Sequence, residues 1–193
     1  MRIIDNSRIE SQFAELSAER LIVTMKWGEI GLEESGFLIS LVQSSDPTRP
    51  IVEIGTLFGF STSIIAAAKQ NKQPLITVDN FAWNALGLSA VKQENLTRHL
   101  LAEAVRDLNC EIVKSDKNVF YENYRGPAPA LVFLDAIHDY PETRKDILWA
   151  RKVGASIICG HDYLSMFPGV IQAVDEFGGP AKRVDSLWLL RNV

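Results

Sequence analysis

The sequence predicts an α/β protein whose mainly parallel sheet is covered by helices on both faces. Short apolar runs of strand length alternate with longer segments of helical periodicity between residues 51 and 190. Runs such as IVEI and ALVFL are apolar almost throughout, which is typical of strands that are buried on both faces. The chain has 193 residues, 47% of them hydrophobic and 23% charged, as expected for one globular domain.

Two helices are expected before the sheet. In residues 1–24, apolar side chains from Ile9 to Ala18 recur near helical spacing, and residues 32–43 carry an apolar stripe that includes Phe37 and Leu41. Pro47 and Pro50 end the second helix. We expect these helices, within residues 1–45, to pack on or cap the core of a single domain spanning 1–193.

The elements of the sheet region follow in order. Further helices are expected over 61–69, 88–108, 141–152 and 168–177, the second with Val91 and Val105 facing inward. Strands are expected over 51–54, 75–78, 110–113, 130–134, 155–159 and 186–190.

Charge and composition exclude several classes of function. The 24 carboxylates outnumber the 20 Lys and Arg residues, which gives a net charge of −4 and argues against a nucleic-acid partner. No segment approaches the about 20 apolar residues of a membrane span, and Asp5 and Glu10 interrupt any signal-peptide core. We therefore expect a cytoplasmic protein without a membrane partner, in which Cys110 and Cys159 are buried and not paired.

Polar residues follow the first three strands, where ligands bind in a doubly wound sheet. The turn Gly55-Thr56-Leu57-Phe58-Gly59 lacks the G-x-G-x-x-G pattern of dinucleotide-binding proteins, which argues against a nicotinamide cofactor. Asp79, 24 residues after Gly55, is placed to accept hydrogen bonds from two ribose hydroxyls. Ser115 and Asp116 could read an adenine amino group, or could form a solvated turn.

Histidine and aspartate clusters follow the next two strands. Asp135-Ala136-Ile137-His138-Asp139 comes after the fourth strand, and Gly160-His161-Asp162 after the fifth. A single His or Asp is usually structural, but two such clusters at one edge of a sheet predict a functional site.

These residues carry a resemblance to a known family. IVEIGTLFGFSTSIIAAA resembles the glycine-rich first motif of class I S-adenosylmethionine (SAM)-dependent methyltransferases. LVFLDAIHDYPETRKDI and IICGHDYLSMFPGVIQAVDEF are similar to methyltransferase family 24, the group of macrocin O-methyltransferase and cephalosporin hydroxylase-like proteins. The resemblance covers residues 28–191. It implies a Rossmann-like seven-stranded sheet of order 3-2-1-4-5-7-6 with strand 7 antiparallel.

The resemblance also implies a cofactor site. Glu53, Gly55 and Gly59 would line the methionine part of SAM, with Thr56, Ser61 and Thr62 nearby. Asp79 and Asn80 would lie at the ribose, and Ser115 and Asp116 at the adenine. Asp135 completes the cofactor residues.

A divalent cation and a base are the remaining expectations. In several relatives the aspartate matching Asp135 and an acidic pair matching His161-Asp162 bind a cation, and this chain departs from them in having His161. Carboxylates favour Mg²⁺, so we expect Asp135, His161 and Asp162 as its ligands; alternatively the carboxylates only orient the histidines. A hydroxyl acceptor loses a proton during transfer, and His138 or His161 is the expected base.

The predicted function is therefore SAM-dependent O-methylation of a small-molecule hydroxyl on a sugar or natural product, with S-adenosylhomocysteine (SAH) as product. A non-catalytic SAM- or nucleotide-binding protein and a nicotinamide-dependent oxidoreductase are the alternatives. We expect a small-molecule acceptor as partner and a homodimer as the assembly. Candidate wall residues of the acceptor pocket are Met25, Trp27, Phe81, Trp83, Tyr163, Met166 and Phe167.

Overall fold

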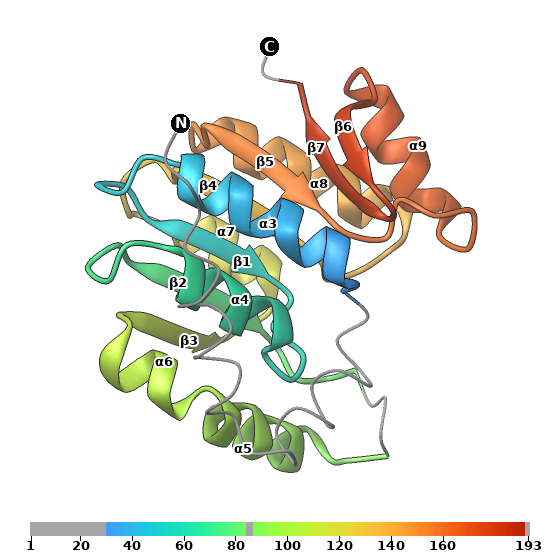
Figure 1. The fold of residues 1–193 in the computed structure, drawn as a ribbon. Coiled ribbons are helices and arrows are strands. Elements are labelled where there is room, and N and C mark those ends of the chain that lie inside the picture. Colours follow the sequence, from blue (N-terminus) through green and yellow to red (C-terminus); the bar gives the residue numbers. More distant parts are fainter. Residues whose placement is uncertain (1–29, 84–86, 192–193) are drawn as a thin grey trace.

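The structure, a computed structural model, describes residues 30–83 and 87–191 (Figure 1). Its centre is a seven-stranded sheet of order β3-β2-β1-β4-β5-β7-β6, in which β7 is antiparallel to both of its neighbours and β1 to β5 are parallel. This confirms the predicted strand order. The strands are β1 (Ile51–Ile54), β2 (Leu75–Asp79), β3 (Cys110–Lys114), β4 (Leu131–Leu134), β5 (Ile157–Gly160), β6 (Pro180–Val184) and β7 (Leu187–Leu190).

Helices cover both faces of the sheet, as the buried strands require (Figure 1). One face carries α3 (Leu32–Ser44), α4 (Phe60–Ala68) and α6 (Ala102–Asp107), with α5 (Ala90–Leu100) next to α6. The other face carries α7 (Lys117–Asn123), α8 (Tyr140–Lys152) and α9 (Pro168–Glu176). The helix predicted over 1–24 lies outside the described residues, and α3 contributes Phe37, Leu38, Leu41 and Val42 to the core.

Alternation along each strand divides the core into two halves. In β4, for example, Leu131 and Phe133 pack with α3 and α4, whereas Val132 and Leu134 pack with α8 and α9. All four residues of β4 are buried. The central strands are therefore mainly apolar on both sides, with Glu53 and Thr77 as buried polar exceptions.

Three local features differ from the sequence-based ranges. The resemblance implied seven strands, but no residue range was predicted for the edge strand β6, because it begins with Pro180 and its Lys182 and Arg183 are exposed, so it lacks an apolar signal. Helix α7 was also not expected. The helix predicted over 88–108 divides at Leu101, whose backbone leaves helical geometry while its side chain is buried, and Val91 and Val105 are exposed rather than inward.

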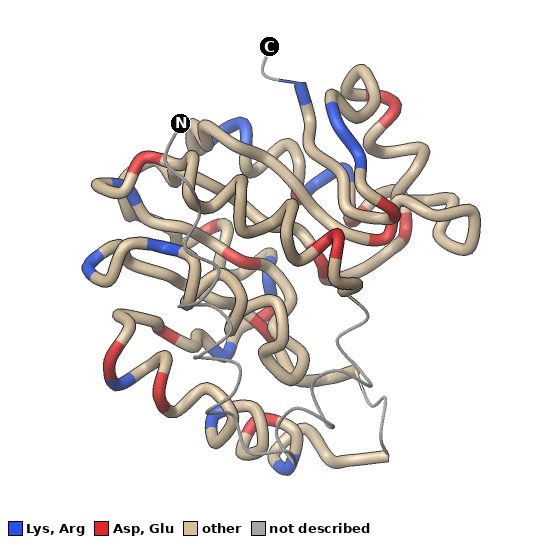
Figure 2. Tube along the Cα trace, viewed as in Figure 1, with Lys and Arg blue, Asp and Glu red and all other residues tan. Residues whose placement is uncertain are grey.

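The two cysteines and the charges agree with the sequence-based expectations. Cys110 in β3 and Cys159 in β5 are buried and free, with three strands between them. Lys and Arg alternate with Asp and Glu along the described trace, in keeping with the small net charge (Figure 2). Within residues 30–83 and 87–191, no helix has the length and apolarity needed to cross a membrane.

Candidate active site

The carboxyl ends of β1 to β5 meet at one cavity of about 570 Å³, a size typical of small-molecule sites. Leu134 pairs with Gly160, so the residues that follow β4 and β5 begin side by side. Most of the predicted site residues line this single cavity: Gly55, Thr56, Ser61, Asp79, Asn80, Ser115, Asp116, Asp135, His138, His161 and Asp162.

The glycine turn after β1 is shaped by contacts within the protein. Gly55 has φ +99°, and a Cβ added there would lie 1.8 Å from the carbonyl oxygen of Asp135. Gly59 has φ +86°, and its Cβ would lie 2.7 Å from Cγ of Leu101. Only glycine fits these two positions. The space that a Cβ would need is taken by the backbone after β4 at Gly55 and by the side chain of Leu101 at Gly59. Gly59 itself does not line the cavity.

Glu53 lies beneath the turn and not in the cavity, contrary to its predicted role beside the methionine moiety. It is fully buried, and its carboxylate accepts hydrogen bonds from Ser61 Oγ (2.6 Å), Thr62 Oγ1 (2.5 Å) and Thr77 Oγ1 (2.6 Å). Thr62 is likewise buried away from the cavity. Burial raises the pKa of Glu53 to about 7 although the three hydroxyls oppose the shift. Glu53 therefore anchors the turn to α4.

Asp79 closes the turn from the side of β2. Its Oδ2 accepts the backbone N–H groups of Thr56 and Leu57, both at 2.8 Å, and its Oδ1 accepts that of Phe81 at 2.6 Å. Leu57 and Phe81 both have positive φ, which places strained backbone on either side of this carboxylate. Asp79 thus holds the turn in shape as well as lining the cavity, and its contact with a ribose stays a prediction.

Ser115 and Asp116 line the cavity at the end of β3. Asp116 also caps α7, because its Oδ1 accepts the backbone N–H groups of Asn118 (2.8 Å) and Val119 (3.4 Å). An aspartate directly after a strand is a helix-start signal that could have revealed α7. Both sequence-based interpretations of Asp116, as a turn residue and as a cavity residue, are compatible with this placement.

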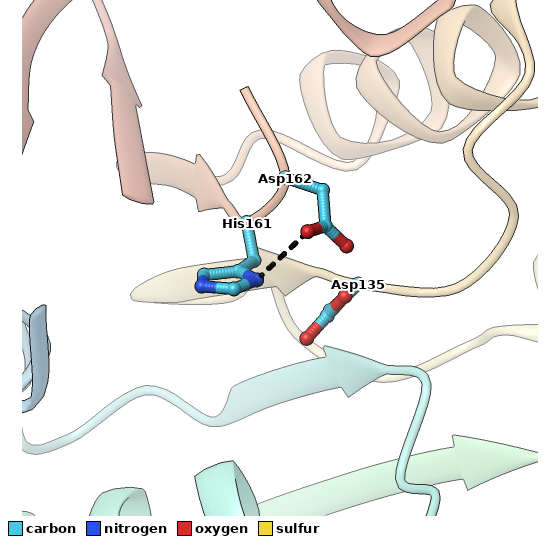
Figure 3. Close-up of side chains that lie close together, drawn as sticks. All are labelled: Asp135, His161 and Asp162. Atoms are coloured by element: carbon cyan, nitrogen blue, oxygen red, sulfur yellow. Dashed lines mark ion pairs between the residues drawn. The ribbon is translucent and has the colours of Figure 1, made fainter. Parts of the chain in front are cut away.

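Three potential metal ligands converge after β4 and β5. Asp135, His161 and Asp162 each offer a ligand atom, and these atoms lie within 4.8 Å of one another (Figure 3). Asp162 has φ +62°, and its Oδ1 lies 3.3 Å from Nδ1 of His161. Although burial opposes ionisation, His138 and His161 hold the pKa of Asp162 well below its ordinary value. The cluster has the donors of the predicted cation site.

His138 completes the cluster from the loop after β4. Its Nε2 lies 2.9 Å from Oδ2 of Asp162 and 3.5 Å from Oδ1 of Asp135. These contacts are ion pairs with a protonated ring, and beyond them this buried nitrogen has no hydrogen-bond partner among the described residues. Burial disfavours the charged ring, but the two carboxylates outweigh it and raise the pKa of His138 to about 10.

His161 is more deeply placed than His138. Its Nε2 lies 2.8 Å from Oγ of Ser186 and 3.3 Å from Oε1 of Glu34. Burial lowers its pKa, but the carboxylates of Asp162, Asp135 and Glu34 prevail and raise it to about 9. Glu34 and Ser186 were not predicted as site residues, and because they are 152 positions apart in the sequence no local pattern connects them.

Apolar side chains form the remaining wall of the cavity. Among the predicted wall residues, Trp83, Met166 and Phe167 line it, and Trp83 and Met166 are 64% and 78% exposed. Phe81 instead packs in the core with Leu101 and Ile112. Tyr163 does not line the cavity, and its hydroxyl donates to Asp175. Met25 and Trp27 lie outside the described residues.

Comparison with protein families decides the class. A family model described as "Methyltransferase domain", that of methyltransferase family 24, matches residues 52–163, more than half of the chain and all five parallel strands. The chain belongs to this family of class I methyltransferases. No curated protein sequence matches the methyltransferase.

Solved structures share the fold of the methyltransferase. An O-methyltransferase from Bacillus cereus in complex with SAH has 19% identity and a TM-score of 0.64, covering 91% of this chain and 80% of that one. TomG from Streptomyces achromogenes, an O-methyltransferase of tomaymycin synthesis in complex with SAM, has 19% identity and a TM-score of 0.61, covering 95% and 89%. CalS11, a TDP-rhamnose 3′-O-methyltransferase of calicheamicin biosynthesis, has 15% identity and a TM-score of 0.58, covering 99% and 96%.

Proposed function

We propose that the protein transfers the methyl group of SAM to a hydroxyl group of a small molecule. The observation that carries this proposal is the continuity of the cavity. Residues that could hold SAM, after β1 to β3, and the acidic and histidine cluster, after β4 and β5, line the same cavity of about 570 Å³. A donor and an acceptor bound there would be in contact.

For SAM we propose the part of the cavity formed by the glycine turn and the ends of β2 and β3. Backbone of Gly55 and Thr56 would face the methionine moiety, Asp79 and Asn80 the ribose, and Ser115 and Asp116 the adenine. Glu53, Gly59 and Thr62 would support this region from beneath. The SAM and SAH complexes of structurally similar proteins support the choice of cofactor.

For this reaction the protein would have to align the acceptor hydroxyl with the methyl group of SAM and remove the proton of that hydroxyl. Much of the rate of methyl transfer can come from holding the acceptor oxygen in line with the methyl group. The hydroxyl must also lose its proton, and His138 lies at the cavity wall with Nε2 facing the carboxylates. With those carboxylates unneutralised, His138 holds its proton at neutral pH, since its pKa is about 10. His138 can therefore act as the base only once their charge is compensated.

A divalent cation fits this requirement. Asp135 and Asp162 supply hard oxygen ligands and His161 a nitrogen, and a cation bound to them would compensate the carboxylate charge that His138 faces at 2.9 Å. Such an ion would lower the pKa of an acceptor hydroxyl and fix its orientation. We propose Mg²⁺ with Asp135, His161 and Asp162 as ligands.

The acceptor is proposed to be a sugar or an aromatic natural product. Trp83, Met166 and Phe167 add apolar surface to the cavity that holds the charged cluster, and the Phe167 ring lies 4.5 Å from that of His138, which suits a ring that carries hydroxyl groups. Two structurally similar proteins act in natural-product biosynthesis, one of them on TDP-rhamnose. A homodimer and a cytoplasmic location stay predictions.

The deciding experiment combines binding and turnover. Calorimetry should show SAH binding, with thermal stabilisation by mass action, and labelled SAM with a panel of hydroxylated sugars and phenols should yield methylated product. Loss of product with EDTA and recovery with Mg²⁺ would support the cation. No SAH binding at millimolar ligand would refute the proposal, and binding without transfer to any acceptor would favour the non-catalytic alternative.

A further inference from the structure

We infer that Glu34, acting through the hydroxyl of Ser186, keeps a proton on Nε2 of His161 and so presents Nδ1 of that ring to Asp135 and Asp162. Glu34 and Ser186 are then positioning residues of the site. The inference about the hydrogen bonds among Glu34, Ser186 and His161 does not depend on the proposed function. The effect of these hydrogen bonds on cation binding does rest on the proposed function.

Glu34 is held as a buried acceptor. It lies in the first turn of α3 and is only 3% exposed. Its Oε2 accepts the backbone N–H of Gly31 at 2.8 Å, and its Oε1 accepts the backbone N–H groups of Ser186 (2.7 Å) and Leu187 (3.1 Å). Backbone N–H groups thus donate to both oxygens of the carboxyl group, which stabilises its ionised form. An ionised carboxylate can only accept hydrogen bonds.

Because the Glu34 carboxylate can only accept, the direction of the hydrogen bond between Ser186 and His161 is also determined. Ser186 Oγ lies 2.7 Å from Oε1 of Glu34 and 2.8 Å from Nε2 of His161. The hydroxyl has one proton, which it donates to the carboxylate, so toward His161 it can only accept. The proton of the second bond must therefore belong to Nε2. Oε1 of Glu34 itself lies 3.3 Å from Nε2 and favours the same proton.

The orientation of the ring is fixed by the same elements. Trp188 Nε1 in β7 donates to the carbonyl oxygen of His161 at 2.9 Å, which holds the backbone where β5 ends. Ser186 lies in the turn before β7, and Glu34 lies in α3. His161 is therefore contacted by α3, by this turn and by β7. A flip of the ring would put the carbon Cε1 in place of Nε2, and Ser186 and Glu34 would then lose their contacts with a ring nitrogen.

The opposite nitrogen therefore serves the site. Nδ1 lies 3.3 Å from Oδ1 of Asp162 and is turned toward the two aspartates (Figure 3). With Nε2 protonated, Nδ1 is the nitrogen whose lone pair becomes available when the ring is neutral. Carboxylates that orient a ligating histidine in this way typically change metal affinity by about 10- to 100-fold when removed.

The direct test is long-range ¹H–¹⁵N NMR of the full chain labelled with ¹⁵N-histidine, without metal. The chain has three histidines, and spectra of His99→Gln and His138→Gln assign the signals of His161. We expect Nε2 of His161 to keep its proton at every pH at which the protein is folded, and Nδ1 to be the nitrogen that loses one. A bare Nε2 with a protonated Nδ1 would overturn the inference.

Variants test the role of Glu34. In Glu34→Gln the uncharged amide no longer obliges Ser186 to donate to it, so a form with the proton on Nδ1 should become populated. Mn²⁺ affinity, followed by electron paramagnetic resonance, should fall by about 10-fold or more, while SAH affinity is retained. Glu33→Gln is the matched control, because Glu33 is exposed in the same turn of the same helix.

The outcomes separate this inference from the proposed function. If Glu34→Gln is less stable but keeps the wild-type proton on Nε2 and the wild-type Mn²⁺ affinity, Glu34 has only a structural role. If wild-type protein binds no Mn²⁺ but shows the expected Nε2 proton, the cation proposal fails and the hydrogen-bond inference stands. If Glu34→Gln does not fold, the wild-type spectrum alone decides.

Discussion

The Oδ2 oxygen of Asp162 lies 2.9 Å from the Nε2 nitrogen of His138, although the two residues follow different strands. The same carboxylate faces His161 with its other oxygen, at 3.3 Å. Asp162 is thus shared by both histidines, and it is the residue of the cluster whose loss should have the widest effect.

Asp162→Asn should lower methyl transfer by about 10²-fold or more, because it removes a proposed cation ligand and a charge from His138. SAH affinity should change little, since Asp162 follows β5, whereas the residues proposed to hold SAM follow β1 to β3. Steady-state kinetics and calorimetry measure the two quantities. The control is Asp139→Asn, at an exposed cap of α8 where asparagine is also a good cap. Wild-type turnover in Asp162→Asn would contradict the role of this residue.

His138→Gln should lower kcat by about 10²- to 10⁴-fold, the usual contribution of a general base. The KM for SAM should stay near its wild-type value, because His138 follows β4, whereas the residues proposed to hold SAM follow β1 to β3. His99→Gln, on the exposed side of α5, serves as the control. If kcat fell less than about twofold, the base would be another group.

Asp79→Asn should weaken SAH binding by about 10-fold or more. Each oxygen of Asp79 accepts backbone N–H groups, and an amide nitrogen in place of either oxygen cannot accept them. Such charge-assisted bonds contribute about 1.5–3 kcal/mol. Calorimetric titration with SAH gives the affinity. Asp46→Asn, whose carboxylate accepts hydrogen bonds from Thr48 in an exposed turn, should bind SAH like wild type.

Gly55→Ala should destabilise the fold by more than Gly178→Ala. The two glycines have nearly the same φ, +99° and +97°, so both substitutions carry the left-handed strain of about 1–2 kcal/mol. Only at position 55 does the Cβ meet backbone, the carbonyl of Asp135, whereas Gly178 has nothing within 4 Å. Denaturant unfolding of both variants measures the difference. Equal losses would show that β1 can move away from β4 at no cost.

Glu53→Gln should flatten the dependence of stability on pH. The pKa of Glu53 is raised from 4.5 to about 7 in the folded protein, so between these values the folded state binds a proton that the unfolded state releases. The stability that Glu53 contributes is present below pH 4.5 and is lost as pH rises to about 7, by at most about 1.4 kcal/mol per pH unit. Unfolding free energies of both proteins across this range test it, with exposed Glu33→Gln as control. Parallel curves for wild type and Glu53→Gln would refute the shift.

The sequence by itself determined the parallel strands and the edge at which the site lies. Strands β1 to β5 are mainly apolar, and polar or glycine residues lie at or just after their carboxyl ends, where the site forms. For this reason Gly55, Asp79, Asp116, Asp135 and His161 could be found without coordinates. The antiparallel order of the last strands came only from the resemblance to a family, because exposed β6 carries no apolar pattern.

Tertiary structure alone decided which atoms these side chains meet. Glu53 was expected beside the cofactor, but its position in a strand turns it toward the hydroxyls of α4 and Thr77. Glu34 drew no attention in the sequence, because one carboxylate in the first turn of an amphipathic helix is usually solvated. Packing of α3 over the sheet buries it 3.3 Å from Nε2 of His161. Contacts of this kind join residues far apart in the chain, so their partners follow from the assembled layers and not from any local pattern.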